Sequence, residues 1–180
     1  MTRPRLVIVA MFLALGGVSA VAGYEMAPSR GGDWHEIAWP FSRDGWPAGR
    51  AFRCRAADCG ADVEVYIRPK LGFCNCDSGV ADDGEVDRVA DVDMITPRFT
   101  PLKAGDVVYV ADMRGRIRAY DIDMPGGKRS AIGIAVSQRC DLLVAAAQGR
   151  GDPARVQRAA VTFLQSREIE RWMRSALNDR

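Results

Sequence analysis

Cysteines are the residues of this chain best suited to chemistry, and four of the five lie between positions 54 and 76. Cysteine pairs become disulfides in oxidising compartments, whereas similar groups in the cytosol more often bind metal or react. Cys74 and Cys76 are one residue apart. On an extended chain their side chains would point the same way, with Cα atoms roughly 6.5 Å apart, near the upper limit for a bridge. We therefore expect each to bond a different partner.

The sequence does not select one pairing, because five cysteines allow many arrangements of two bridges and one free thiol. We expect two disulfides within a cluster of four cysteines, and a buried free thiol at Cys140, because Cys140 begins an apolar segment. The cluster comprises Cys54, Cys59, Cys74 and Cys76.

The alternative interpretation is a zinc or copper site. Four thiolates suit Zn²⁺ or Cu(I), and His35, the only histidine, could add a nitrogen ligand. The spacing lacks the paired C-x2-C knuckles of a zinc ribbon, and the chain has no redox-type C-x-x-C. We therefore favour disulfides, keep a metal-handling protein as the alternative, and expect no other cofactor.

No catalytic constellation is recognisable in the sequence. Asp33 and Glu36 flank His35, but there is no G-x-S-x-G motif and no papain-type signature. A glycine-rich phosphate loop and a dinucleotide fingerprint are also absent. We therefore predict no catalytic residues and a non-catalytic accessory or binding protein, whose partner is an envelope protein or a small ligand.

Two groups of side chains could form a binding surface. Tryptophans could stack on a sugar ring or a partner, or could instead fill the core. A basic hairpin could meet an anionic headgroup or an acidic partner, although charges on an exposed hairpin also guard it against aggregation. The first group is Trp34, Trp39 and Trp46; the second is Arg114, Arg116 and Arg118 with Lys128 and Arg129.

The N-terminus has the order of a secretory signal. Arg3 and Arg5 precede an apolar run, and small residues follow it. We predict a signal peptide or an uncleaved anchor over residues 1–22, an entry segment over 23–33 and a single domain over 34–180. The protein is then periplasmic, and it is tethered to the inner membrane only if the leader stays uncleaved.

The charge balance argues against a nucleic-acid partner. The chain has 25 Lys and Arg against 23 Asp and Glu, and two of the arginines lie in the leader. The remainder is therefore neutral and has no electrostatic reason to bind nucleic acid, whose affinity comes mainly from phosphate neutralisation.

Hydrophobic periodicity indicates an α+β fold with an antiparallel sheet. Short strands are expected at 34–39, 50–54 and 62–70, where Val63, Val65 and Ile67 share one face. Residues 55–58 have the length of a hairpin loop. Four further strand-like runs, at 106–113, 116–122, 128–137 and 140–148, predict a four-stranded meander.

Helices are expected at the C-terminus. Asp152 and Pro153 suit a helix start, and a second helical pattern begins after Ser166. These two helices should cover the apolar face of the sheet. Residues 82–93 could form a short helix capped by Asp82 or Asp83, or a solvated loop, and 96–106 are expected to be irregular.

The cysteine-containing stretches also carry a resemblance. The segment "GRAFRCRAADCGADVEVYIRPKLGFCNC", followed by "GVADDGEVDRVADVD", "RGRIRAYDI" and "QRCDLLVA", resembles a group of short exported proteins of alphaproteobacteria with no established activity. The resemblance covers most of the mature chain. It implies an exported compartment and a shared cysteine framework, and it assigns no catalytic residue.

Overall fold

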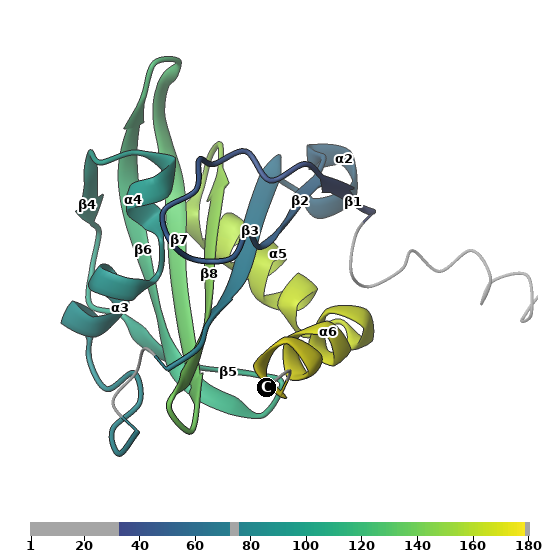
Figure 1. Cartoon of the computed structure of the whole chain (residues 1–180). Helices are drawn as coiled ribbons and strands as arrows, with labels where there is room; N and C mark the ends of the chain where they lie inside the picture. The colour runs from purple at the N-terminus through teal and green to yellow at the C-terminus, as the bar shows by residue number, and fades with distance from the viewer. Residues whose placement is uncertain (1–32, 73–75, 179–180) are drawn as a thin grey trace, which may run out of the picture. The chain divides into compact units, whose positions relative to one another are not determined.

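The computed structural model describes residues 33–72 and 76–178, all within one compact unit, Gly31–Arg180. Its fold is α+β, with one antiparallel sheet of eight strands and helices on both faces (Figure 1). The predicted fold class is therefore confirmed. The predicted leader and nearly all of the entry segment lie outside the described residues. Within the described ranges, no helix is long and apolar enough to cross a bilayer.

The order of the strands follows the chain only in part. It runs β1-β2-β3-β8-β7-β6-β4, and β5 pairs with β6 beside β4. The last strand thus inserts next to β3 and joins the N-terminal strands to the meander. The strands are β1 Trp34–Ile37, β2 Arg50–Cys54, β3 Val63–Lys70, β4 Phe99–Pro101, β5 Asp106–Val110, β6 Met113–Met124, β7 Gly127–Gln138 and β8 Asp141–Gly149.

The predicted four-stranded meander is confirmed as β5 to β8. Each strand pairs antiparallel with the next, through tight two-residue turns. Ala111, Asp112, Gly127 and Arg139 in or beside these turns have positive φ. Such backbone values are typical of hairpin turns whose twist matches the flanking strands.

The two predicted C-terminal helices cover one face of the sheet. They are α5 Pro153–Leu164 and α6 Arg167–Asn178. The Asp152 carboxylate caps α5 by accepting a hydrogen bond from the Ala154 N–H at 3.0 Å. Val156 and Phe163 of α5 pack in one core with Val63, Val65 and Ile67 of β3. Alternation along β3 therefore sends its apolar side chains toward these helices, as the pattern indicated.

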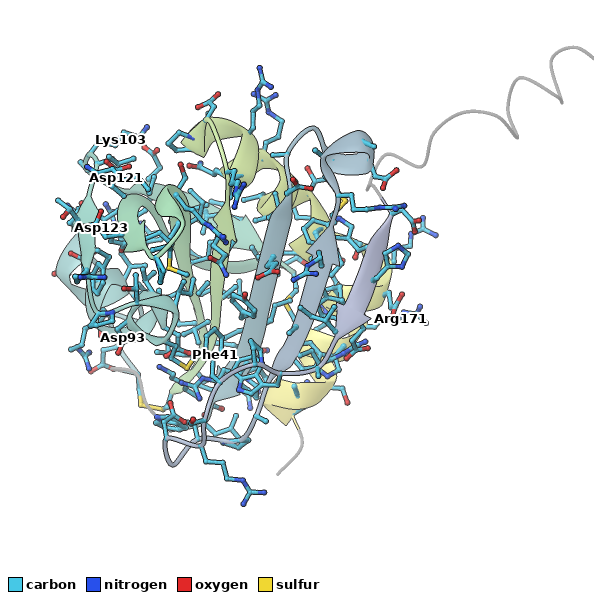
Figure 2. All side chains as sticks on the ribbon, turned by 90° about the horizontal axis from the view of Figure 1, so that it is seen from above. Phe41, Asp93, Lys103, Asp121, Asp123 and Arg171 are labelled. Atoms are coloured by element: carbon cyan, nitrogen blue, oxygen red, sulfur yellow. A yellow bond between two sulfur atoms is a disulfide. The ribbon has the colours of Figure 1, made fainter. Side chains whose placement is uncertain are left out.

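A second layer, which the sequence did not predict as a cover, lies on the opposite face. It consists of α3 Asp83–Val89, α4 Val92–Ile95 and the segment 38–49, whose Phe41 lies over this face (Figure 2). Of the two alternatives for 82–93, the helix is present, because the Asp82 carboxylate accepts from Glu85 N–H and caps α3. Gly133 permits this close packing, since a Cβ there would lie 3.0 Å from the Ala90 Cβ.

Two segments are more regular than predicted, although the first, as expected of a hairpin, joins the antiparallel strands β2 and β3. The segment after Cys54 forms a helical turn, α2 Ala56–Cys59. At its start, the Ala56 N–H donates a hydrogen bond to the Asp62 carboxylate, and at its end Gly60 adopts the left-handed conformation. Residues 99–101 form β4 against β6. The helical turn is held by local contacts, whereas β4 depends on its pairing with β6, which local patterning does not reveal.

Charged side chains on the second face of β3 are buried and paired. Arg68 donates to the carboxylates of Asp91 at 2.7 Å and Asp44 at 2.6 Å, and Lys70 donates to Asp91 at 2.6 Å. Arg68 is 2 % exposed and Lys70 5 %. The network fastens segment 38–49 and the α3–α4 junction to the sheet, because unpaired charges buried there would be strongly unfavourable.

The cysteine pairing differs from the prediction. Cys54 bonds Cys59 across the turn of α2, whereas Cys76 bonds Cys140. Cys140 is therefore not a free thiol, and only one bridge lies inside the predicted cluster. The β7–β8 turn brings Cys140 to the loop after β3, a contact that strand patterning cannot show. Cys74 lies outside the described residues.

Candidate binding site

A charged pocket of about 380 Å³ opens where β2, β3, β7 and β8 run side by side. The strand register places Arg53 beside Glu64 and Glu64 beside Gln148, so that the three side chains share the face opposite α5 and α6. The pocket is lined by Arg53, Arg55, Asp62, Val63, Glu64, Arg129, Gln148, Gly149 and Arg150.

The polar side chains at the base of the pocket are hydrogen-bonded to one another. Glu64 accepts hydrogen bonds from Arg53, from the Tyr66 hydroxyl and from Gln148 Nε2, the last at 3.0 Å. Gln148 Nε2 also donates to the Tyr66 hydroxyl at 2.8 Å, although Gln148 is only 7 % exposed. These bonds hold the three side chains in one arrangement and rigidify the wall.

Burial and hydrogen bonding together move the pKa values of Glu64 and Tyr66 away from neutral pH. Burial by itself would raise the pKa of Glu64, but bonds from Tyr66 and Arg53 outweigh it and lower the pKa. Burial and the bond to Glu64 raise the pKa of Tyr66 above its usual value. Glu64 therefore stays a carboxylate and Tyr66 a phenol throughout the physiological range.

Positive charge is in excess in the pocket. Its lining holds four arginines against two carboxylates. Arg53 is bonded to Glu64, and Arg55 lies 3.6 Å from the Asp58 carboxylate. Neither Arg129 nor Arg150 forms an ion pair with a residue in the described ranges. Two arginines of the pocket are therefore without an ion pair to any described residue, whereas the remaining carboxylate of the lining, Asp62, accepts a hydrogen bond from Ala56 N–H.

Arg129 also carries an unused donor. Its Nη1 lies 3.4 Å from Gln148 Oε1, a weak bond, while its Nε is buried without a partner in the described part of the chain. A buried donor left unsatisfied costs about 1–3 kcal/mol, and native proteins rarely retain one without a reason. The site therefore presents a charged donor with nothing to bond.

The predicted metal ligands do not come together. Cys54, Cys59 and Cys76 are consumed in disulfides, and the side chain of His35 is 58 % exposed with Nε2 3.4 Å from Asp33. Among residues 33–72 and 76–178, no group of three or more His, Cys, Asp or Glu side chains could hold a metal ion. The four-thiolate alternative is therefore wrong for these cysteines.

The three predicted tryptophans do not form one surface. Trp34 stacks on Phe163 of α5 at 4.2 Å between ring centroids, on the helical side of the sheet. Trp39 packs edge-on against Phe41 and Tyr66 on the opposite face. Trp46 lies 6.0 Å from the Lys70 ammonium. All three are partly buried, so packing explains them better than ligand stacking.

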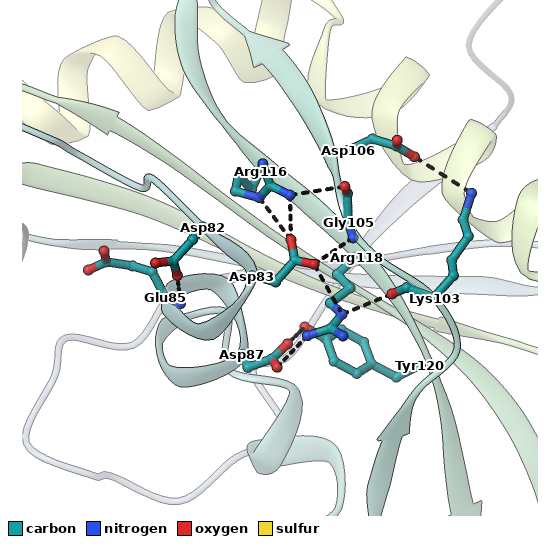
Figure 3. A network of polar contacts seen from close by, with 10 residues as sticks. All are labelled: Asp82, Asp83, Glu85, Asp87, Lys103, Gly105, Asp106, Arg116, Arg118 and Tyr120. Carbon is teal, nitrogen blue, oxygen red and sulfur yellow. Dashed lines mark hydrogen bonds and ion pairs between the residues drawn. The ribbon is translucent and has the colours of Figure 1, made fainter.

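The predicted basic hairpin is neutralised in part by the acidic helix α3, which pairs with two of its five basic residues. Figure 3 shows Asp83 bonded to Arg116 and to the Gly105 N–H, and Asp87 bonded to Arg118. Arg114 is exposed and forms no ion pair with a described residue. Arg114 is therefore the one of these three arginines without an ion pair to a described residue. The acidic stretch 82–93, for which a solvated loop was one alternative, is the partner of Arg116 and Arg118.

Three of the four pocket arginines were missed by the sequence analysis. Only Arg129 stood in a group that it singled out. Arg53 and Arg55 flank Cys54 in "RCR", and Arg150 lies in the turn "GRGD". No local signal links them, because the strand order that places β8 beside β3 brings them together.

Comparisons with known proteins add little to this geometry. No protein-family model and no curated protein matches the chain. Among solved structures, a crystal structure of a Pseudomonas aeruginosa protein of unknown function, described as a putative regulator, matches with a TM-score of 0.38 and 12 % sequence identity. The match covers 78 % of this chain and 85 % of that chain. A likeness at this level carries no argument about function.

Proposed function

We propose that the mature chain is an exported, disulfide-stabilised accessory protein of the cell envelope, which binds a ligand non-covalently in the arginine pocket. Export is supported by the signal-like residues 1–22 and by the two disulfides, which persist in oxidising compartments. The resemblance to short exported alphaproteobacterial proteins supports the same compartment.

Binding without catalysis is carried by one observation, the hydrogen-bonded side chains at the base of the pocket. Glu64 and Tyr66 are bonded to each other, and their pKa values lie on either side of neutrality. General acid–base catalysis needs a group that exchanges protons near the working pH. The four cysteines described are bonded, so none of them is a nucleophile. Neither Glu64 nor Tyr66 is therefore poised to exchange protons near neutral pH, which supports binding without catalysis.

Thiol counting and cell fractionation test the proposal. The full chain, expressed with its own leader, should appear in the periplasmic fraction. No more than one of its five cysteines should react with a thiol reagent before reduction. Three or more reactive thiols, or a chain confined to the cytosol, would overturn export. Release of p-nitrophenol from p-nitrophenyl phosphate or acetate above the buffer rate would overturn the absence of catalysis.

A further inference from the structure

We infer that the pocket takes a doubly charged oxyanion, the phosphate monoester group of a small molecule, held between Arg129 and Arg150. The inference rests on the proposed function, because it names the ligand class of the same binding pocket. Three observations carry it: the placement of these two arginines at the ends of the neighbouring strands β7 and β8, their lack of ion pairs with described residues and the pocket that they line.

Arg129 of β7 and Arg150, the residue after β8, lie just beyond the last pair of the ladder between these two strands and line the same pocket. The ladder between β7 and β8 ends with Ser130 opposite Gly149, and the next residues outward are Arg129 and Arg150. Like charges held near each other repel. Two arginines that line one pocket therefore favour an anionic ligand, and no carboxylate of the described residues forms an ion pair with either of them.

The pocket surroundings leave both guanidinium groups available. The carboxylate of Glu64 is already shared by Arg53, Tyr66 and Gln148. Gln148 meets Arg129 through a single weak bond, and the buried Nε of Arg129 has no described acceptor. An incoming oxygen would therefore satisfy a donor that the protein does not satisfy.

The chemistry of the guanidinium group selects the ligand. Its planar fork matches the oxygens of phosphate or carboxylate, and bidentate bonds of this type are among the strongest. A phosphate monoester carries about −1.5 to −2 charges at pH 7, which balances two arginines, whereas a carboxylate balances one. The volume of about 380 Å³ exceeds that of the bare anion and leaves room for the rest of a small molecule.

Titration calorimetry of the oxidised mature protein tests this inference, with inorganic phosphate as the probe and acetate and chloride as comparisons. Phosphate should bind more tightly than acetate, and its affinity should rise between pH 5 and 8 as its second proton leaves. Arg129→Gln and Arg150→Gln should each weaken phosphate at least tenfold. Arg98→Gln, which removes the same charge from an exposed site near β4, should change the affinity less than twofold.

A second readout covers the free protein. Without phosphate, Arg150→Gln should raise the melting temperature, because it removes one of two like charges that line the same pocket. Arg98→Gln should not raise it. Phosphate affinity unchanged by both pocket substitutions, or lowered equally by Arg98→Gln, would overturn the inference. Binding to phosphatidylglycerol vesicles without binding to phosphate would overturn it in favour of a lipid headgroup. These failures would leave thiol counts and fractionation, and hence the proposed export, unaffected.

Discussion

The bridge between Cys76 and Cys140 should contribute more to stability than the bridge within the predicted cluster. In the chain-entropy description, a disulfide stabilises the fold by restricting the unfolded chain, and its effect grows with the length of the closed loop. The sequence separation is 64 for this pair and 5 for Cys54 and Cys59. These separations correspond to about 4 and about 2 kcal/mol respectively.

The substitution that tests this removes both partners, Cys76→Ala with Cys140→Ala, so that neither thiol can form another bridge. Cys76 is exposed and Cys140 half-buried, so little packing is lost with them. Cys59→Ala is the matched control, because it opens the short loop while Cys54 keeps its buried position as a thiol. Urea unfolding under non-reducing conditions gives both free energies.

The double substitution should lower the free energy of unfolding by about 4 kcal/mol, against about 2 kcal/mol for Cys59→Ala. A loss no larger than that of the control would refute the reasoning. It would mean either that the unfolded chain is already restricted elsewhere, or that Cys140 is unbonded in the native protein. A thiol count on the wild-type protein separates these two explanations.

Three further predictions concern the second face of the sheet. Asp91→Asn keeps a residue that tolerates the positive φ of 61° but removes the carboxylate charge that Arg68 and Lys70 share. It should lower the free energy of unfolding in urea by about 3 kcal/mol, the low end for a broken buried pair, because Arg68 keeps Asp44 and Lys70 keeps the Val89 carbonyl. An effect below about 1 kcal/mol would contradict the role of this buried pair. The hydrogen bond from Arg68 lowers the pKa of Asp44 from 3.8 to about 2, so its contribution is complete above pH 4 and lost as the pH falls toward 2. Because Asp44 is 38 % exposed, we expect this ion pair to contribute only about 1 kcal/mol to the free energy of unfolding. As the pH is lowered from 5 to 2, the urea midpoint of Asp44→Asn should therefore fall less steeply than that of the wild-type protein. Gly133→Val should overpack the junction of α3 and α4, which should destabilise the fold by about 1–3 kcal/mol and lower the melting temperature. An unchanged melting temperature would show that this layer can move away from the sheet.

Much of the fold was predictable because its signals are local. The meander showed itself in runs of strand-forming residues separated by turn residues, and α5 in the Asp152–Pro153 start. The residues of α3 were assigned less surely, since an acidic amphipathic turn and a solvated loop have similar composition. The cap from Asp82 and the buried Val86 and Val89 decide between them.

The candidate site was harder to predict, since its residues come from strands distant in sequence. The sequence showed that the hairpin is basic, but it did not show which of its arginines would form ion pairs with carboxylates. The α3 carboxylates neutralise Arg116 and Arg118, and none reaches Arg129. The availability of a charge depends on distances across the fold, which spacing along one strand does not contain.

By itself, the sequence determined the strand faces, the turns of the meander, the two C-terminal helices and the oxidisable character of its cysteines. Each follows from interactions over a few residues, such as alternation, capping and backbone preference. The tertiary structure alone decided the insertion of β8 beside β3, the bond from Cys76 to Cys140, the second covering layer and the meeting of Arg129 and Arg150 in one pocket. These features arise when strands far apart along the chain pair, and only then do distant charges and thiols become neighbours.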